Sequence, residues 1–110
     1  MKLNHIHIRV HDLPGALVWL DRIWDAKPTF QNEHLASVSL DPITLIVEES
    51  DKETDTIIGF ESNDCDRDFR LLMERGAIAD AAPADKPWGA RTAYIKGPGA
   101  LKFEIEAPVK

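Results

Sequence analysis

The opening of the chain joins two contrasting patterns of apolar residues. Between residues 3 and 10, apolar and polar side chains alternate, which predicts a strand with one apolar face. Asp12 then precedes a segment in which apolar residues recur at helical spacing, with a proline in its first turn. This helix is expected to run from about residue 13 to about residue 25, because Pro28 disfavours its continuation. A strand that leads directly into a helix limits the folds that the chain can adopt.

The same order returns in the second half of the chain. Residues 56–61 alternate as a strand, and Asp64 can cap a helix over residues 65–75 that ends at Gly76. At one constant offset Asp12 matches Asp64, and the apolar residues of the two helices superpose as well. Strand-like runs follow each helix at residues 29–33, 35–40 and 43–48 in the first half and at residues 78–81, 91–96 and 101–106 in the second. Each half therefore predicts the order strand–helix–strand–strand–strand.

The length of the chain sets its domain organisation. We expect the 110 residues to form a single α+β domain built from two βαβββ modules. Module 1 is placed at about residues 1–50, a polar linker at about residues 49–55 and module 2 at about residues 56–110. A domain this short buries only a modest share of its surface, which favours association into a dimer.

Charge and cysteine content exclude several classes of partner. The formal net charge is −6, whereas nucleic acids and anionic membranes attract basic proteins; the negative sign is compatible with a cationic small ligand. No segment approaches the roughly 20 apolar residues of a membrane span, and the opening lacks a signal-peptide pattern. The lone cysteine, Cys65, provides neither a disulfide framework nor a thiolate metal cluster. We therefore expect a cytoplasmic protein with a small-molecule ligand and with no nucleic-acid or membrane partner.

Three stretches of the sequence resemble motifs of the vicinal-oxygen-chelate superfamily, which includes glyoxalases, bleomycin resistance proteins and extradiol dioxygenases. Residues 3–13 (Leu-Asn-His-Ile-His-Ile-Arg-Val-His-Asp-Leu) are similar to its opening strand, and residues 97–104 (Gly-Pro-Gly-Ala-Leu-Lys-Phe-Glu) to its closing turn and strand. Residues 87–91 (Pro-Trp-Gly-Ala-Arg) resemble a segment frequent in the bleomycin-resistance-like branch. The resemblance covers essentially the whole chain. It implies a glyoxalase-like incomplete barrel, with the two modules around a cavity, and a homodimer.

The resemblance also implies that the polar parity of the strands faces this cavity. Its expected members are His5, His7, Arg9, Thr44, Ile46, Glu48, Ile57, Gly59, Glu61, Lys102, Glu104 and Glu106. Arg9 either pairs with Glu61 across the cavity or holds an anionic group of a ligand. Arg91 could also hold an anionic group of a ligand. From this set and the segment at residues 87–91, the residues expected to contact a ligand are His5, His7, Arg9, Glu48, Ile57, Glu61, Trp88, Arg91 and Glu104.

The tryptophans and the cysteine have separate expectations. Trp88, between a proline and a glycine, either offers a stacking surface for a planar or cationic ligand or covers the end of the barrel. Trp24 fits the apolar stripe of the first helix and is expected in the core, whereas Trp19 does not fit and is a candidate dimer contact. Cys65 lies in the first turn of the second helix among acidic residues, and we interpret it as a bystander.

Metal-dependent members of the family hold a divalent ion such as Zn, Ni, Mn or Fe with His and Glu side chains of the central strands. By resemblance, His5 and Glu104 match two of these ligands. The remaining ligand positions fall on Ile57 and Ile46, which have no lone pair to donate. A catalytic site usually has at least three protein ligands. The matching set is therefore incomplete.

Three interpretations of His5 and Glu104 remain open. The two side chains form a relic pair that hydrogen-bonds to each other or to a ligand, or both are simply solvated. In the third interpretation a substitute ligand, such as His7 or Glu48, completes a working metal site. His7 is separated from His5 by roughly 6.6–7 Å along the strand, which is long for two ligands that each lie about 2 Å from one ion.

Two functions follow from these alternatives. The favoured hypothesis is a bleomycin-resistance-like protein without catalytic metal, which binds a small cationic or aromatic molecule in a cleft at the module or dimer interface and gives antibiotic resistance by binding alone. The alternative is a metal-dependent lyase, isomerase, transferase or dioxygenase that uses His5 and Glu104 with a substitute third ligand. A fold kept for protein interaction and a metal-free acid–base enzyme are further options. The sequence leaves open whether the chain is an enzyme.

Overall fold

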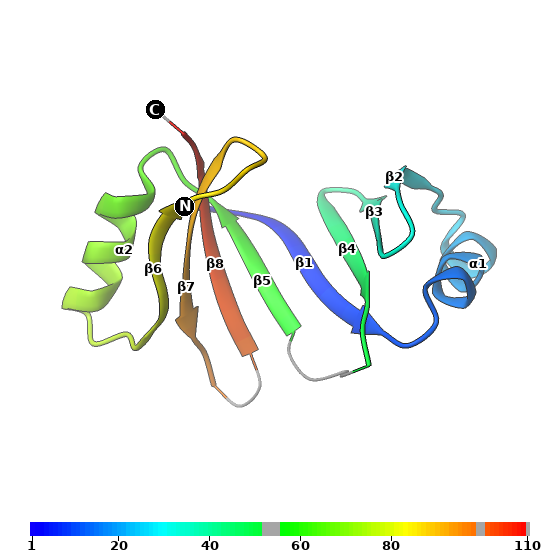
Figure 1. Ribbon diagram of the computed structural model, residues 1–110, viewed down its shortest axis with the longest axis horizontal. Helices are drawn as coiled ribbons and strands as arrows, with labels where there is room; N and C mark the ends of the chain where they lie inside the picture. Colours follow the sequence, from blue (N-terminus) through cyan, green and yellow to red (C-terminus); the bar gives the residue numbers. More distant parts are fainter. Residues whose placement is uncertain (52–55, 99–100, 110) are drawn as a thin grey trace. The chain divides into compact units, whose positions relative to one another are not determined.

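The computed structural model describes residues 1–51, 56–98 and 101–109. The chain divides into two compact units, His5–Thr56 and Met1–Asn4 together with Ile57–Lys110 (Figure 1). The elements follow the predicted order of strand–helix–strand–strand–strand twice, which confirms the α+β class. The predicted linker begins inside a strand at Glu49, and its residues 52–55 lie outside the described part. Within the described ranges, neither helix has the length and apolar character that a membrane span requires.

The unit His5–Thr56 combines a mixed sheet with helix α1. Its elements are β1 (Lys2–Val10), α1 (Leu13–Trp24), β2 (Pro28–Gln31), β3 (Leu35–Leu40) and β4 (Ile43–Glu49). The strands follow the order β2-β3-β4-β1. β1 runs parallel to β4, whereas β2 pairs with β3 and β3 with β4 in antiparallel fashion. A parallel pair needs a long connection between its strands, and α1 with the next two strands provides it.

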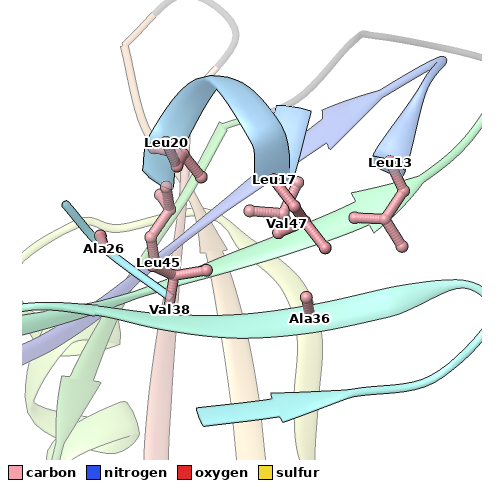
Figure 2. Packing of buried hydrophobic residues seen from close by; sticks show 8 residues of the cluster. All are labelled: Leu13, Leu17, Leu20, Ala26, Ala36, Val38, Leu45 and Val47. Atoms are coloured by element: carbon pink, nitrogen blue, oxygen red, sulfur yellow. The ribbon is translucent and has the colours of Figure 1, made fainter. Parts of the chain in front are cut away.

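Helix α1 covers one face of this sheet (Figure 2). Asp12 caps the helix, because its carboxylate accepts a hydrogen bond from the Gly15 N–H at 3.0 Å. Buried residues of α1, the segment after it, β3 and β4 form one apolar cluster, made of Leu13, Leu17, Leu20, Ala26, Ala36, Val38, Leu45 and Val47. The alternate residues Ile6, Ile8 and Val10 of β1 pack against the same cluster. The polar residues of β1 therefore face away from the helix.

The prediction that Trp24 lies in the core is wrong. Its side chain is 65% exposed, although its position fits the apolar stripe of α1. Asp25 adopts a left-handed backbone conformation (φ 52°) and ends the helix directly after Trp24. Ala26, which follows this reversal, is buried in the apolar cluster instead. Trp19 is exposed as well, and its expected role as a dimer contact stays a prediction.

The unit formed by Met1–Asn4 and Ile57–Lys110 contains the second set of elements. They are β5 (Thr56–Glu61), α2 (Cys65–Glu74), β6 (Ala79–Asp85), β7 (Ala90–Lys96) and β8 (Leu101–Pro108), with the strand order β5-β8-β7-β6. Asp64 caps α2 as predicted, by accepting a hydrogen bond from the Arg67 N–H at 3.1 Å. Phe69 and Leu72 of α2 pack against a buried cluster made of Cys65, Ala93, Ile105 and Ala107. The intervening residues of β7 and β8 therefore face away from α2.

Strand β6 is longer than the strand predicted at residues 78–81. It runs over Ala79–Asp85 and contains Pro83, although alanine, aspartate and proline have little preference for strands. Antiparallel pairing with β7 holds β6, and the Lys86 N–H donates to the Ala90 carbonyl at 2.7 Å where the two strands connect. β6 ends the strand order, which is where a proline is tolerated in a sheet. The length of β6 is therefore set by its pairing with β7 rather than by the strand preference of its own residues.

Cys65 is a structural thiol. Its side chain is buried, and the Sγ–H donates to the Ile105 carbonyl at 3.6 Å. Burial, with the charge of Asp66 as a second cause, raises the pKa of the Cys65 thiol to about 11. The thiol therefore remains protonated at neutral pH, in agreement with its interpretation as a bystander.

Leu13 and Val18 of α1 provide a matched test of the core. Leu13 is 2% exposed and Val18 is 63% exposed. We expect Leu13→Ala to lower the free energy of unfolding by about 2–5 kcal/mol, because it leaves a cavity against the sheet. Val18→Ala should change it by no more than about 0.5 kcal/mol. Urea unfolding of both variants measures the difference, and equal losses would contradict the assignment of the two faces.

Candidate functional site

Two imidazoles lie side by side on the polar face of β1. His5 is 6% exposed, and the ring centroids of His5 and His7 are 4.8 Å apart with their planes inclined by 56°. The potential ligand nitrogens of the two rings lie within 4.8 Å of each other. The spacing of His5 and His7 along the backbone therefore does not keep their rings apart, because the tilt of the side chains brings the rings together. Small changes of side-chain torsion can direct both nitrogens to one cation.

The parallel pairing of β1 and β4 aligns the polar residues of β1 with residues of β4 on the same face of the sheet. His5 lies opposite Thr44, His7 opposite Ile46, and Arg9 opposite Glu48. Paired residues of neighbouring strands point to the same side, so these side chains form one surface away from α1. Ile46, where the family pattern expects a glutamate ligand, is thus the cross-strand neighbour of His7. An imidazole on β1 stands beside the position on β4 that lacks a donor.

Arg9 and Glu48 form an ion pair at the end of this surface. The Arg9 Nε lies 3.6 Å from the Glu48 Oε1, and both side chains are partly exposed. An exposed pair of this kind contributes little to stability. Its role is to give the Glu48 carboxylate a cationic neighbour, which favours His7 over Glu48 as the substitute ligand. The expected pairing of Arg9 with Glu61 and the ligand contacts of Arg9 and Glu48 stay predictions.

Glu104 of β8 is a buried carboxylate with a phenol beside it. Its side chain is 2% exposed, and Tyr94 lies opposite on the antiparallel strand β7. The Tyr94 hydroxyl donates a short hydrogen bond to the Glu104 Oε2. Burial raises the pKa of the Tyr94 phenol, and the hydrogen bond to Glu104 raises it further. Tyr94 therefore remains a hydrogen-bond donor that fixes the orientation of the carboxylate.

The apolar residues that alternate with Glu104 and Glu106 show which face of β8 is polar. Ile105 and Ala107 are buried against α2, so Glu104 and Glu106 point to the opposite side. The cross-strand partners of these two glutamates are Tyr94 and Thr92. Ile57, the remaining position of the family's ligand pattern, is buried on β5 and offers only hydrocarbon.

Trp88 lies in the connection between β6 and β7. Its side chain is 67% exposed, which is the arrangement of a stacking surface rather than of a plug over a core. Gly89 has φ +88°, a conformation that favours glycine and turns the chain into β7. The indole borders a surface hollow that also contacts Glu61 and Glu106. Its ligand contact remains a prediction.

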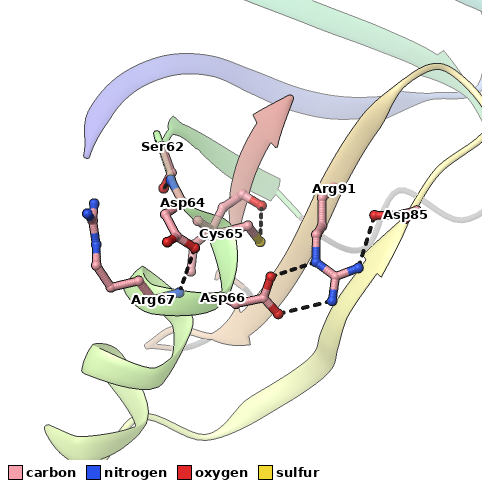
Figure 3. Close-up of polar contacts among 8 residues, drawn as sticks. Ser62, Asp64, Cys65, Asp66, Arg67, Asp85 and Arg91 are labelled. Atoms are coloured by element: carbon pink, nitrogen blue, oxygen red, sulfur yellow. Dashed lines mark hydrogen bonds and ion pairs between the residues drawn. The ribbon is translucent and has the colours of Figure 1, made fainter. Parts of the chain in front are cut away.

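Arg91 lies on the face of β7 opposite to Tyr94, next to the start of α2 (Figure 3). Its Nε and one terminal nitrogen donate to the two oxygens of Asp66 at 2.7 and 3.0 Å. The other terminal nitrogen donates to Asp85 at 3.0 Å. The hydrogen bonds to Asp66 and Asp85 raise the pKa of Arg91, and the hydrogen bond from the Arg91 guanidinium lowers the pKa of Asp66. Arg91 thus connects α2, β6 and β7, while its expected contact with a ligand stays a prediction.

The chemistry of the donors fits a divalent metal ion. His5 and His7 of one strand would provide two imidazole nitrogens. The family pattern adds the carboxylate oxygen of Glu104 as the third donor. Nitrogen and oxygen donors of this kind suit Zn, Ni, Mn and Fe. Three protein ligands also reach the usual minimum for a catalytic metal site, with coordination positions left for a ligand. The set that the sequence left incomplete thus has a third candidate in His7.

No known protein-family model matches the sequence, and no curated protein matches it either. Its fold is nevertheless similar to those of many solved structures. Hypothetical protein BH1468 from Bacillus halodurans C-125 aligns over 99% of this chain and 95% of that chain, with a TM-score of 0.77 and 16% identity. Streptomyces coelicolor methylmalonyl-CoA epimerase in complex with 2-nitronate-propionyl-CoA aligns over the same shares, with a TM-score of 0.73 and 16% identity. NAD-dependent benzaldehyde dehydrogenase from Legionella pneumophila aligns over 96% and 99%, with a TM-score of 0.77 and 13% identity.

These likenesses define the fold of the chain. Methylmalonyl-CoA epimerase has the glyoxalase fold of the vicinal-oxygen-chelate superfamily, so the resemblance inferred from the sequence motifs is confirmed for the fold. At sequence identities of 13–16%, the similarity establishes the fold of the chain but does not identify its substrate. Function must therefore be argued from the side chains.

Sequence reasoning missed Tyr94 entirely, and it kept His7 as a candidate substitute ligand while counting the backbone spacing against it. The hairpin of β7 and β8 contained a signal for Tyr94. Lys96 pairs with Lys102 next to the turn, so the residues two positions further along each strand, Tyr94 and Glu104, also form a pair. No comparable signal exists for His7. The approach of its ring to His5 depends on side-chain torsions, which the alternation of a strand does not specify.

Tyr94 is the only tyrosine of the chain, so a spectroscopic titration reports on it alone. We expect its phenolate band to appear well above pH 10 in the folded protein and near pH 10 in urea, because burial and Glu104 disfavour the anion. Since the folded state holds the proton longer, this contribution to stability is complete below pH about 10 and is lost as the pH rises further. Glu104→Gln should lower the folded pKa without restoring the ordinary value. Ionisation near pH 10 in the folded protein would contradict the contact.

Proposed function

We propose that the chain is a metal-binding protein with the glyoxalase fold, in which His5, His7 and Glu104 together hold a divalent transition-metal ion. The observation that carries the proposal is the convergence of the two imidazoles on β1. It adds a third donor to the two that match the family pattern. The proposal reverses the expectation that the protein works without metal, and it develops the alternative in which a substitute ligand completes the site.

The surroundings of the three side chains support this role. Burial of Glu104 makes an unpartnered charge costly, and the hydrogen bond from Tyr94 holds its carboxylate in one orientation. Orienting partners of this kind are a regular feature of metal ligands in proteins. Ile46 beside His7 places hydrocarbon next to the donors and limits the access of water.

The substrate class that fits this proposal is a small molecule with two neighbouring oxygen atoms. A bound divalent cation would act as a Lewis acid toward those oxygens. The chain itself contributes the orientation of Glu104 through Tyr94, an apolar wall at Ile46 and the Arg9 guanidinium on the same face as His7. The guanidinium can attract an anionic group of a substrate. A lyase, isomerase, transferase or dioxygenase reaction would each be compatible with these contributions.

A second candidate function is metal-free binding of a small cationic or aromatic molecule, with protection against a toxic compound as its outcome. The exposed indole of Trp88 favours it, because a rigidly held aromatic surface in water is suited to stacking. We place either function in a cytoplasmic homodimer, since a chain of this length gains buried surface by association.

Titration of metal-free protein with Ni²⁺, Zn²⁺, Mn²⁺ and Fe²⁺ tests the first proposal, with calorimetry for affinity and elemental analysis for stoichiometry. We expect one ion per chain. His5→Ala, His7→Ala and Glu104→Gln should each weaken binding on the order of 100-fold or more, because even the outer partners of ligands contribute about 10–100-fold. The control is His34→Ala, which removes an imidazole that is 80% exposed in a loop. No ion retained, or equal affinity in His7→Ala and His34→Ala, would sink the proposal and leave the metal-free function.

The Tyr94→Phe variant tests whether Tyr94 orients the Glu104 carboxylate without being a metal ligand itself. The phenylalanine keeps the ring and removes only the hydroxyl that donates to Glu104. We expect metal affinity to fall by about 10–100-fold while the stoichiometry remains one ion per chain. Unchanged affinity would mean that Tyr94 does not position the ligand.

A further inference from the structure

Thr92 carries a buried hydroxyl on β7. The residue is 1% exposed, and its Oγ1 is the one buried side-chain polar atom among the described residues that makes no hydrogen bond of ordinary geometry. A buried hydroxyl without a partner costs free energy, and such groups are rare in folded proteins. The hydroxyl of Thr92 therefore calls for a physical explanation within the unit Met1–Asn4 and Ile57–Lys110.

The position of Thr92 in the sheet limits what its hydroxyl can reach. Ala93, the next residue of β7, is buried in the cluster under α2. Side chains alternate along a strand, so Thr92 and Tyr94 share the opposite face. Glu106 of β8 lies directly across the ladder from Thr92. The side-chain acceptors beside Thr92 on this face are therefore the phenol oxygen of Tyr94 and the carboxylate of Glu106.

The phenol oxygen of Tyr94 has the capacity to accept a hydrogen bond. Tyr94 donates its single proton to Glu104, which leaves the lone pairs of the phenol oxygen for another donor. Burial is the main cause that raises the pKa of Tyr94 and Glu104 adds to it, whereas a hydrogen bond from Thr92 acts in the opposite direction. The Thr92 hydroxyl thus lies close to the phenol oxygen, and a small rotation of the side chain gives the contact ordinary geometry.

A donor at the phenol oxygen would strengthen the contact between Tyr94 and Glu104. Hydrogen bonds in a chain polarise one another, so a phenol that accepts a bond becomes a better donor. Thr92 has a branched side chain with few accessible torsions and is enclosed on all sides. It therefore offers Tyr94 a rigid point of attachment within the same strand.

We propose that Thr92 is a positioning residue for the Glu104 carboxylate, because its hydroxyl donates to the phenol oxygen of Tyr94 and completes a chain of hydrogen bonds from Thr92 through Tyr94 to Glu104. The inference rests on the proposed function, in which Glu104 is a metal ligand. It adds a residue that acts on this ligand only through another side chain.

The first test observes Tyr94 directly in metal-free protein. Tyr94 is the only tyrosine of the chain, so tyrosine isotopically labelled at Cζ gives one NMR resonance, whose position responds to hydrogen bonds at the phenol oxygen. We expect Thr92→Val, which replaces the hydroxyl by a methyl group, to move this resonance. Thr92→Ser keeps a hydroxyl and should leave the resonance near its original position. The matched control is Thr29→Val, which removes an exposed hydroxyl of the other unit and should have no effect.

A double-mutant cycle of Thr92→Val and Tyr94→Phe identifies the acceptor. We expect Thr92→Val alone to raise the equilibrium constant of unfolding about twofold to tenfold, which is the range of one hydrogen bond. In the Tyr94→Phe background this effect should disappear or change sign, because the hydroxyl has already lost its acceptor. The same methyl group enters in both backgrounds, so its own packing cancels. A hydroxyl without any partner predicts the opposite result, since its replacement would stabilise the folded state.

Metal titration tests the effect on Glu104. We expect Thr92→Val to weaken binding by about threefold to tenfold, at the lower end of what outer partners of metal ligands contribute, and Thr92→Ser to restore it. Combined with Tyr94→Phe, Thr92→Val should cause no further loss, because Thr92 acts only through Tyr94.

Three outcomes would overturn the inference. They are an unmoved Cζ resonance in Thr92→Val, an unfolding cycle in which Thr92→Val couples to Glu106→Gln instead of Tyr94→Phe, and a metal affinity that Thr92→Val leaves unchanged. If the protein retains no ion at all, the proposed function fails. The resonance and the unfolding cycle then still decide whether Thr92 holds Tyr94 and, through it, the Glu104 carboxylate.

Discussion

Burial of one sheet face under one helix controls where the polar side chains lie in each unit. In the unit His5–Thr56, Ile6 and Ile8 pack toward the apolar cluster of α1. The period of two along a strand then sends His5 and His7 to the opposite face. In the other unit, Ile105 under α2 has the same effect on Glu104. A register shift of one residue would exchange the two faces, so the apolar contacts specify the donors as well as the fold.

The features that the sequence predicted well are those with local causes. Asp12 and Asp64 cap their helices because a carboxylate can reach a free N–H three residues later. The parity of β1 and of β8 follows from alternation alone. The failures involve contacts between distant residues or freedom within a side chain. Trp24 is exposed because the chain reverses at Asp25. The spacing of the apolar residues in the helix does not predict this reversal.

The candidate metal ligands show how one fold can supply a donor from more than one strand. The family pattern puts a glutamate at the position of Ile46 on β4, and this chain has none there. Its neighbour across the parallel ladder is His7 on β1. Because paired residues point to the same side, a donor on either strand reaches the same level of the surface. Comparison of single aligned positions would miss an exchange of this kind.

The edge formed by β6 also bears on how the protein behaves at high concentration. A strand at the end of a sheet exposes unpaired N–H and C=O groups, which can template the addition of a strand from another molecule. β6 carries Pro83, which has no N–H to offer, and aspartates at Asp80 and Asp85. The donor that is missing at Pro83 opposes the pairing of two such edges. This edge therefore resists the growth of the sheet into fibrils, although the rest of its residues are alanines.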